Sequence, residues 1–310
     1  MYESTVTAGP RLSNWTAGRK GGVAITGATG WIGAALADFA LRALPAKMPV
    51  RLYGSSARTL QLGGRRVAIE ALADAPPLGD GEWLLLHLAV LGVEPAALGE
   101  ANDVILAQAL RLAESGAVRR LVFASSGAVH EVGGAPDKAA YAEMKRRQEA
   151  AVRGWGARTG TPLLIPRIFN VGGPWITQPD RYALGSFVRQ ALAGGAIEIE
   201  ARRRVVRSYV HVSELAHVIL ELALGGADGL AFDTAGTETV EIAELAAAVG
   251  RALGLEIEVL RGPLSPGEDR YVGDGAIYRE TLARSGLAPI GLDRIVGDTA
   301  DYLRPPTSPG

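Results

Sequence analysis

The stretch "VAITGATGWIGAAL" constrains the fold of this chain more than any other part of the sequence. The apolar run Val23–Thr26 predicts a buried strand, and Gly27, Gly30 and Gly33 follow it at the start of a helical pattern. Such glycines permit a tight turn and let backbone N–H groups approach a phosphate, whose charge is favoured by a helix N-terminus. A glycine-rich turn that binds nothing would have the same composition. The position between strand and helix favours a dinucleotide pyrophosphate site.

The first half of the chain alternates short apolar runs with longer stretches of helical spacing, a pattern typical of βαβ units. The further strands expected are Pro49–Gly54, Arg66–Glu70, Trp83–Ala89, Arg120–Ser125 and Pro162–Ile168. The helices expected are Gly30–Leu44, Ala101–Ser115, Ala139–Thr159, Leu184–Ala193, Ser213–Leu224 and Val240–Leu253. The predicted fold class is therefore α/β, a Rossmann-type doubly wound parallel sheet with a smaller C-terminal substrate-binding region.

The same pattern predicts how the chain is divided. Residues 1–20 are expected to form a flexible N-terminal extension. Residues 21–170 and 206–250 are expected to form the dinucleotide-binding Rossmann domain, and residues 171–205 and 251–310 the substrate region.

The end of the second strand bears on which dinucleotide is bound. An acidic residue there would bond the adenosine ribose 2′-OH, but this sequence has Gly54, followed by Ser55 and Ser56. Arg58 offers a fork of N–H donors that suits a 2′-phosphate. The pattern favours NADP over NAD, with a plain polar turn as the alternative interpretation.

The stretches "VFASSGAVHE" and "YAEMK" carry the candidate catalytic residues. Parallel strands deliver their ends to one edge of a sheet, so Ser126 after the fifth strand and Tyr141 on the next helix can converge. Lys145 lies one helical turn from Tyr141, and its ammonium would lower the phenol pKa from about 10 and make Tyr141 a usable acid–base. Taken alone, a Tyr and Lys four residues apart are common on solvated helices.

With these motifs, the sequence resembles the extended short-chain dehydrogenase/reductases, in the NAD-dependent epimerase/dehydratase family that modifies nucleotide sugars. The resemblance runs from about Val23 to the C-terminus. It includes the G-x-x-G-x-x-G turn, "LHLAV", Asn102, the Ser126, Tyr141 and Lys145 set, "PRIFNVGGP" and "RSYVHVSELA". The last two are long ordered features that a generic Rossmann protein lacks.

The resemblance implies roles for individual residues. Tyr141 would be the acid–base, Lys145 would bond the nicotinamide ribose, and Ser126 would bond the reacting sugar oxygen. Asn170 and Arg207 would hold the substrate diphosphate, a group that suits a guanidinium fork, although Arg207 in a basic run is also consistent with a surface salt bridge. Cofactor contacts are expected at Gly27, Thr29, Gly30, Trp31, Ile32, Gly33, Ser55, Ser56, Arg58, Leu88, Ala89, Val90, Asn102, Tyr141, Lys145 and Ile168.

Two departures from the family pattern affect the expected sugar pocket. His130 and Glu131 stand where a Tyr-Gly pair is usual, and the loop from Ser126 to Tyr141 is short. His130 is therefore a candidate substrate-binding residue, although a single His near a strand end is more often structural. The Asp-Glu pair of 4,6-dehydratases is replaced by "SGA", which disfavours that reaction.

Several functions stay open at this point. The leading hypothesis is an NADP-dependent 4-ketoreductase acting on a nucleotide-diphosphate sugar, because the acid after the second strand is missing. The alternatives are a 4-epimerase that retains NAD, a reductase of a non-sugar carbonyl, and a non-catalytic NAD(P)-binding sensor. Family members commonly dimerise through the helices equivalent to Ala101–Ser115 and Ala139–Thr159, so a homodimer is expected.

Composition excludes other classes of protein. The net charge of −1, from 32 basic and 33 acidic residues, provides no field to attract nucleic acid or an anionic membrane. The chain has no Cys, and its four His lack H-x-x-x-H spacing, so we expect no metal site. The N-terminal residues lack the apolar core of a signal peptide, and we expect a cytoplasmic protein.

Overall fold

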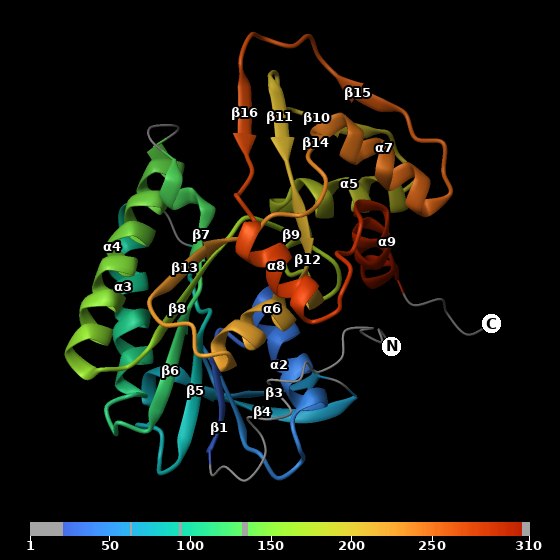
Figure 1. Ribbon diagram of the computed structural model, residues 1–310. Helices are drawn as coiled ribbons and strands as arrows, with labels where there is room; N and C mark the ends of the chain where they lie inside the picture. Colours follow the sequence, from blue (N-terminus) through green and yellow to red (C-terminus); the bar gives the residue numbers. More distant parts are fainter. Residues whose placement is uncertain (1–20, 63, 93–94, 132–135, 306–310) are drawn as a thin grey trace.

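The computed structural model describes residues 21–62, 64–92, 95–131 and 136–305. A large sheet, parallel except at one edge, forms its centre (Figure 1). The strand order is β13 (Leu230–Asp233), β8 (Leu163–Ile168), β6 (Val118–Phe123), β5 (Glu82–His87), β1 (Gly21–Thr26), β2 (Val50–Gly54), β4 (Arg65–Ala71) and β3 (Arg58–Leu62), with β7 (Ser125–Ser126) paired to β8. The order reverses at β1, as in a doubly wound fold. The predicted fold class is confirmed.

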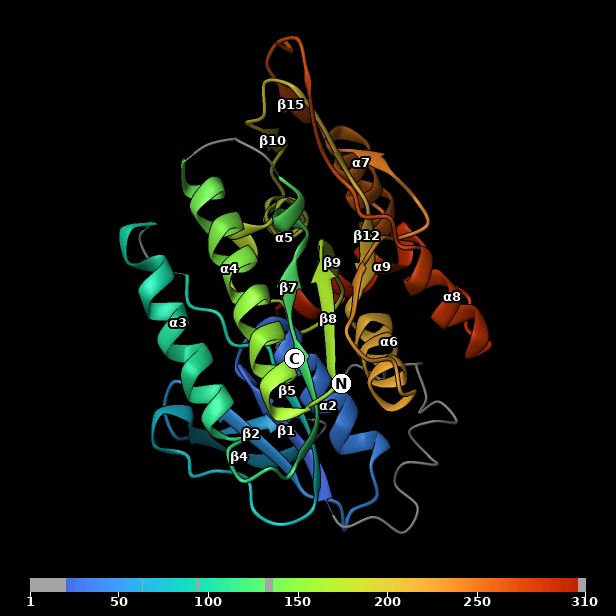
Figure 2. The same cartoon turned by 60° about the vertical axis from the view of Figure 1, so that its left-hand side comes forward.

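Helices cover both faces of this sheet. Along β1, Val23 and Ile25 belong to one buried cluster and Ala24 to another, because successive side chains of a strand point to opposite faces. The first face is covered by α2 (Trp31–Ala43) and α6 (Val212–Leu224), and the second by α3 (Pro95–Arg111) and α4 (Pro136–Thr159), as Figures 1 and 2 show. Burial on both faces explains why the central strands are almost continuously apolar.

The register of the central strands aligns the edge that carries the candidate site. Thr26 of β1 lies beside His87 of β5, and His87 lies beside Phe123 of β6. The last residues of β1, β5 and β6 therefore lie side by side in the sheet. The glycine turn, the segment after His87 and the serines after Phe123 emerge together at the carboxyl edge.

The antiparallel edge strand β3 was not predicted. The segment after β2, interpreted from the sequence as a polar turn, continues into β3, which pairs antiparallel with β4 from Arg58↔Ile69 to Leu62↔Arg65. In the sheet, β3 lies beyond β4 and forms the edge. The chain therefore passes from β2 to β4 through this edge strand. Arg58 is thus the first residue of an edge strand, with an exposed side chain.

The remaining elements build a second body beside the carboxyl edge. Its apolar cluster joins α5 (Ala183–Leu192), α7 (Ile242–Leu253) and α9 (Leu292–Leu303). Its short strands are β9 (Asn170–Gly172) with β12 (Tyr209–His211), β10 (Ile197–Ile199) with β15 (Val259–Arg261), and β11 (Arg204–Arg207) between β14 (Val240–Glu241) and β16 (Glu268–Tyr271). In contrast, α8 (Ala276–Arg284) packs on α6 and β13 of the Rossmann part.

The predicted division into segments stays a prediction. Most of α7 was expected in the Rossmann domain but packs in the second body, whereas α8 was expected in the substrate region but packs on the Rossmann part. Residues 1–20, the expected extension, lie outside the described residues, as does part of the loop before Tyr141. Across the part of the chain that the structure describes, no helix combines the length and apolarity that a membrane crossing requires.

Candidate active site

The glycine turn after β1 is held by close backbone packing. Gly27 has a left-handed φ of 74°, and a Cβ there would lie 2.7 Å from Ala89 Cα. A Cβ on Gly33 would lie 2.0 Å from Gly27 O. At Gly30 an added Cβ would meet Gly27 O at 3.4 Å, an ordinary contact distance. Gly27 and Gly33 thus close the turn, while Gly30 leaves the start of α2 open.

The N-terminus of α2 has the properties of a phosphate cradle. Its N-cap, Gly30, makes no side-chain capping bond, and no acidic residue lies in the first turn. The first N–H groups of a helix lack partners within the helix and carry a partial positive charge. This end of α2 therefore fits a dinucleotide pyrophosphate. Behind it, Trp31 donates from Nε1 to Pro174 O at 2.8 Å and joins the turn to the second body.

The end of β2 is crowded around a glycine. A Cβ on Gly54 would meet Ile69 Cγ2 at 3.0 Å and Thr29 Cγ2 at 3.1 Å, so a longer side chain is disfavoured there. Ser55, Ser56 and Arg58 follow with exposed side chains. The position that would bear an acid in an NAD site is thus occupied by a packed glycine, and only neutral and basic polar groups follow directly.

Asn102 has a structural role that the sequence did not indicate. Its Oδ1 accepts from Leu91 N at 2.8 Å, and its Nδ2 donates to Leu91 O at 2.9 Å and to Leu98 O at 2.8 Å. The amide therefore holds the segment that follows Leu88, Ala89 and Val90 against α3. Asn102 supports this part of the site through the backbone, and its direct contact with a cofactor stays a prediction.

The helix α4 brings Tyr141 and Lys145 to the serines at the sheet edge. Lys145 is buried, and its Nζ donates to Ala124 O at 3.0 Å. Burial lowers the pKa of Lys145 to about 8, and the nearby Glu149 carboxylate raises it in part. Ser126 is also buried, and its Oγ accepts from Ala128 N at 3.2 Å. The predicted catalytic set is thus assembled on adjacent elements.

The expected lowering of the Tyr141 pKa is wrong for this structure. Desolvation raises the pKa of Tyr141 above 10.0, and this effect outweighs the hydrogen bond with Ser126, which lowers it. The ammonium of Lys145 is directed at Ala124 O. Tyr141 is therefore a protonated phenol at neutral pH, the form that donates a proton.

A buried ion pair that the sequence analysis missed lies behind the catalytic set. Glu149 Oε1 accepts from Ser125 Oγ at 2.6 Å, and Arg167 donates to both carboxylate oxygens at 2.9 Å. Burial alone would raise the pKa of Glu149, but the bonds from Arg167 and Ser125 hold it below its usual value. Glu149 lies one helical turn after Lys145, and Ser125 precedes Ser126, so the pair fixes both elements.

Three rings, those of His130, Phe169 and Tyr271, pack in a row beside Ser126. The rings of His130 and Phe169 are stacked, with their centroids 6.3 Å apart. The ring of Phe169 also contacts that of Tyr271, with a centroid distance of 4.5 Å. His130 Nε2 is 2.9 Å from Asp233 Oδ1, so the predicted sugar-pocket histidine has a carboxylate partner. The Tyr271 hydroxyl lies 3.2 Å from Ser126 Oγ. Sequence reasoning missed Tyr271, because "EDRYVGDG" has no pattern that relates it to Ser126.

The two residues predicted to hold a diphosphate flank the Tyr271 strand. Asn170 Nδ2 donates to Ser208 O at 3.1 Å and to Tyr271 O at 3.3 Å. Arg207 Nη1 donates to Asp269 O at 2.8 Å and lies 3.2 Å from Asp269 Oδ1. Among the described residues, the hydrogen bonds and the ion pair of Arg207 all use Nη1, which leaves Nε and Nη2 for an anion.

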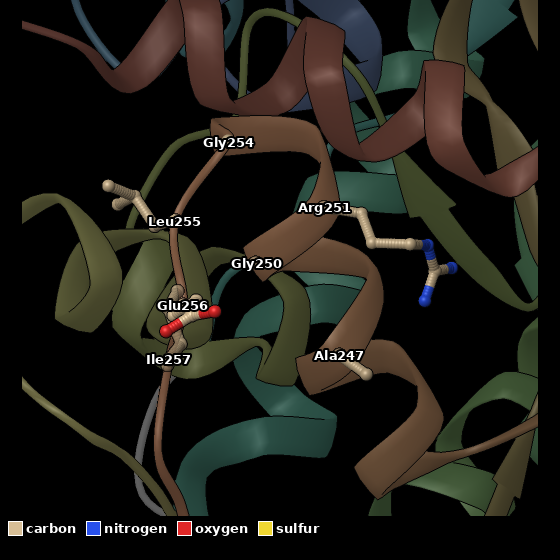
Figure 3. A pocket seen from close by; sticks show the side chains of 7 residues that line it. All are labelled: Ala247, Gly250, Arg251, Gly254, Leu255, Glu256 and Ile257. Carbon is tan, nitrogen blue, oxygen red and sulfur yellow. The ribbon is translucent and has the colours of Figure 1, made fainter.

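A hollow elsewhere in the molecule is not part of this site. Figure 3 shows it at the C-terminal end of α7, and its lining is Ala247, Gly250, Arg251, Gly254, Leu255, Glu256 and Ile257. The only basic group in this lining, Arg251, pairs with Asp293 at 3.0 Å. No candidate catalytic residue lines the hollow.

Comparison with known proteins finds similar sequences over part of the chain. Residues 86–232 match the model of the family described as NAD dependent epimerase/dehydratase. A curated relative, dTDP-L-rhamnose 4-epimerase of Burkholderia thailandensis, is 26% identical over 53% of this chain and 46% of its own length. UDP-glucuronic acid decarboxylase 3 of Arabidopsis thaliana is 26% identical over 43% of this chain and 39% of its length. The matches thus span less than half of these relatives.

Solved structures share the fold over a longer stretch. A UDP-N-acetylglucosamine 4-epimerase from Methanobrevibacter ruminantium, in complex with UDP-N-acetylmuramic acid, has a TM-score of 0.73 at 19% identity and covers 91% of this chain and 97% of its own. A Thermus thermophilus UDP-glucose 4-epimerase in complex with NAD has a TM-score of 0.70 at 21% identity and covers 93% and 100%. The family model thus matches a segment just under half of this chain, and the solved structures show that the chain shares the fold of these epimerases.

Proposed function

We propose that this protein is an NAD(P)-dependent enzyme that acts on a nucleotide-diphosphate sugar, with a 4-ketoreductase as the first candidate. One observation carries the proposal. Ser126, Tyr141 and Lys145 are assembled at the carboxyl edge of the sheet, the same edge at which the open glycine turn begins α2. A non-catalytic sensor would need the glycine turn but not this set of hydroxyl and ammonium groups.

The chain's own residues suit the reduction of a ketone. When bound, the nicotinamide would supply the hydride to the sugar carbon. Tyr141 donates its proton to the ketone oxygen, a role consistent with its raised pKa. Ser126 bonds the same oxygen and stabilises the charge that develops on it. Lys145, held in place by Ala124 O, would bond the ribose of the cofactor and favour the phenolate that Tyr141 leaves behind.

The substrate's diphosphate would be held by Arg207 and Asn170. Arg207 is mostly buried at a side-chain exposure of 15%, so its attraction for an anion is less screened by water than that of a surface arginine. Its ion pair with Asp269 fixes one nitrogen and orients the rest of the guanidinium. His130, backed by Asp233, is proposed to contact the sugar.

A 4-epimerase is the second candidate, favoured by the 4-epimerases among the similar proteins. The two candidates differ in how they use the cofactor. A reductase consumes NADPH in proportion to product, whereas an epimerase interconverts two sugars with no net consumption. Incubation with a panel of UDP-, dTDP-, GDP- and CDP-sugars and their 4-keto derivatives, followed at 340 nm and by chromatography of the sugars, separates them.

Arg58→Ala tests the cofactor assignment. If Ser56 and Arg58 hold a 2′-phosphate, the variant should bind NADPH about 10- to 100-fold more weakly, which corresponds to the loss of one charge-assisted contact. NADH affinity should stay within twofold. Fluorescence titration with both cofactors measures the two effects. Equal affinity of the wild type for NADPH and NADH, unchanged by Arg58→Ala, would instead move the epimerase to first place.

The homodimer also stays a prediction. It would use the outer surface of α3 and α4, where Val104 is an exposed apolar side chain with 51% of its surface accessible. Light scattering at micromolar concentration should give twice the mass of one chain. A monomer under these conditions would contradict it.

A further inference from the structure

The side chain of Tyr271 is fixed against the catalytic edge from several sides. Its backbone pairs with Arg207 of β11, and its ring rests on Phe169. Phe169 is itself held closely, because a Cβ on Gly127 would lie 2.4 Å from its ring and one on Gly273 would lie 2.8 Å from it. The Arg207 guanidinium lies 5.8 Å from the centre of the Tyr271 ring. The position of the Tyr271 hydroxyl is therefore determined by the packing.

This hydroxyl adjoins the serine that the proposed reaction uses. A serine hydroxyl has one proton and two lone pairs. One lone pair of Ser126 Oγ accepts from Ala128 N at 3.2 Å, and Tyr271 Oη lies 3.2 Å from the same oxygen. The amide of Ala128 also bonds the Tyr271 oxygen. The Ala128 N–H thus faces both oxygens, and within the pair of Ser126 and Tyr271 either oxygen can be the donor.

The ionisation state of Tyr271 permits donation from the phenol. Burial raises the pKa of Tyr271 to about 12, although the hydrogen bond with Ser126 lowers it in part. The phenol is therefore protonated at every pH at which the enzyme would be assayed.

We propose that Tyr271 is a positioning residue that donates to Ser126 Oγ and so directs the single proton of Ser126 toward the substrate oxygen. With both lone pairs of Ser126 occupied, its hydroxyl can act only as a donor, to the Tyr141 oxygen in the free protein and to the substrate oxygen when a substrate is bound. Preorganised donors stabilise developing charge without reorientation during the reaction. The inference rests on the proposed function, because it assigns a task to the same Ser126.

A double-mutant cycle on the full-length protein tests this coupling. Tyr271→Phe keeps the ring on Phe169 and removes only the hydroxyl. It should lower kcat about tenfold, the rate equivalent of one neutral hydrogen bond, with cofactor affinity within twofold of wild type. In a Ser126→Ala background, the same substitution should change kcat less than twofold. Tyr302→Phe, on α9, is the matched control and should behave as wild type.

Each other outcome has a definite meaning. A tenfold loss in both backgrounds would show that the Tyr271 hydroxyl acts independently of Ser126 and would overturn the inference. Turnover of Tyr271→Phe within twofold of an active wild type would also overturn it, while leaving the proposed function intact. A folded wild type that turns over no nucleotide sugar of the panel would contradict the proposed function and the inference together.

Discussion

Replacing Tyr141 with Phe is expected to lower turnover by about 10²- to 10⁴-fold, the range that a positioned general acid–base contributes. The substitution removes the hydroxyl and little volume. Tyr141 is a protonated donor at neutral pH, and desolvation raises its pKa further, so a ring without the hydroxyl offers nothing to the substrate oxygen. The measurement is kcat at saturating cofactor and sugar, with unfolding followed in parallel to confirm that the variant is folded.

Cofactor binding gives the control for this variant. Because the glycine turn, β2 and Lys145 are unchanged, the affinity for NAD(P)H should stay within about threefold of wild type. Tyr302→Phe again provides a matched substitution away from the site. Activity of Tyr141→Phe within tenfold of wild type would remove Tyr141 from the acid–base role.

The sequence was most informative where function depends on local spacing. The turn at Gly27, Gly30 and Gly33 follows its strand directly, and a Tyr and Lys one helical turn apart share a face of any helix. A parallel sheet then brings strand ends together, so the convergence of Ser126 with Tyr141 follows from topology. These residues could be named without the structure.

Contacts between distant segments could not be predicted. The bond between Ser126 and Tyr271 joins residues 145 positions apart, and the pair of His130 and Asp233 spans 103 positions. Their approach depends on the path of the chain through the second body, whose short strands have weak patterns. The strand that starts at Arg58 was missed for a different reason, because its polar residues were interpreted as a cofactor turn.

The pKa of Tyr141 shows a third limit of the sequence. Spacing indicated that Lys145 is near enough to lower this pKa, but the sign of the shift depends on how much water the hydroxyl loses. In the structure the desolvation is the larger effect. The same competition acts on Glu149, with the opposite outcome, since Arg167 and Ser125 supply enough hydrogen bonds to overcome burial.

Removing Glu149 should therefore destabilise the fold strongly. Glu149→Ala leaves Arg167, which has a side-chain exposure of 25%, without its bidentate partner, and loss of one member of a buried pair costs about 3–5 kcal/mol in unfolding free energy. Arg153 is the matched control. It approaches the same carboxylate at 4.0 Å from an exposed position, so Arg153→Ala should cost no more than about 1 kcal/mol. Urea unfolding at pH 7 measures both, and equal costs would contradict the assignment.

The pH dependence of a second variant, Arg167→Met, tests the origin of that stability. In the wild type the folded pKa of Glu149 lies below its usual 4.5, so its stabilisation is present above that value and is lost as the pH falls through the folded pKa. Without Arg167, burial should raise the pKa of Glu149 above its unfolded value. The buried carboxylate then opposes folding at neutral pH, and this penalty disappears as the group takes up a proton. The difference in unfolding free energy between wild type and Arg167→Met should consequently be largest near pH 7 and shrink toward about pH 4. Urea unfolding at both pH values measures the difference, and a constant difference would mean that Arg167 stabilises the fold by packing and not through the charge of Glu149.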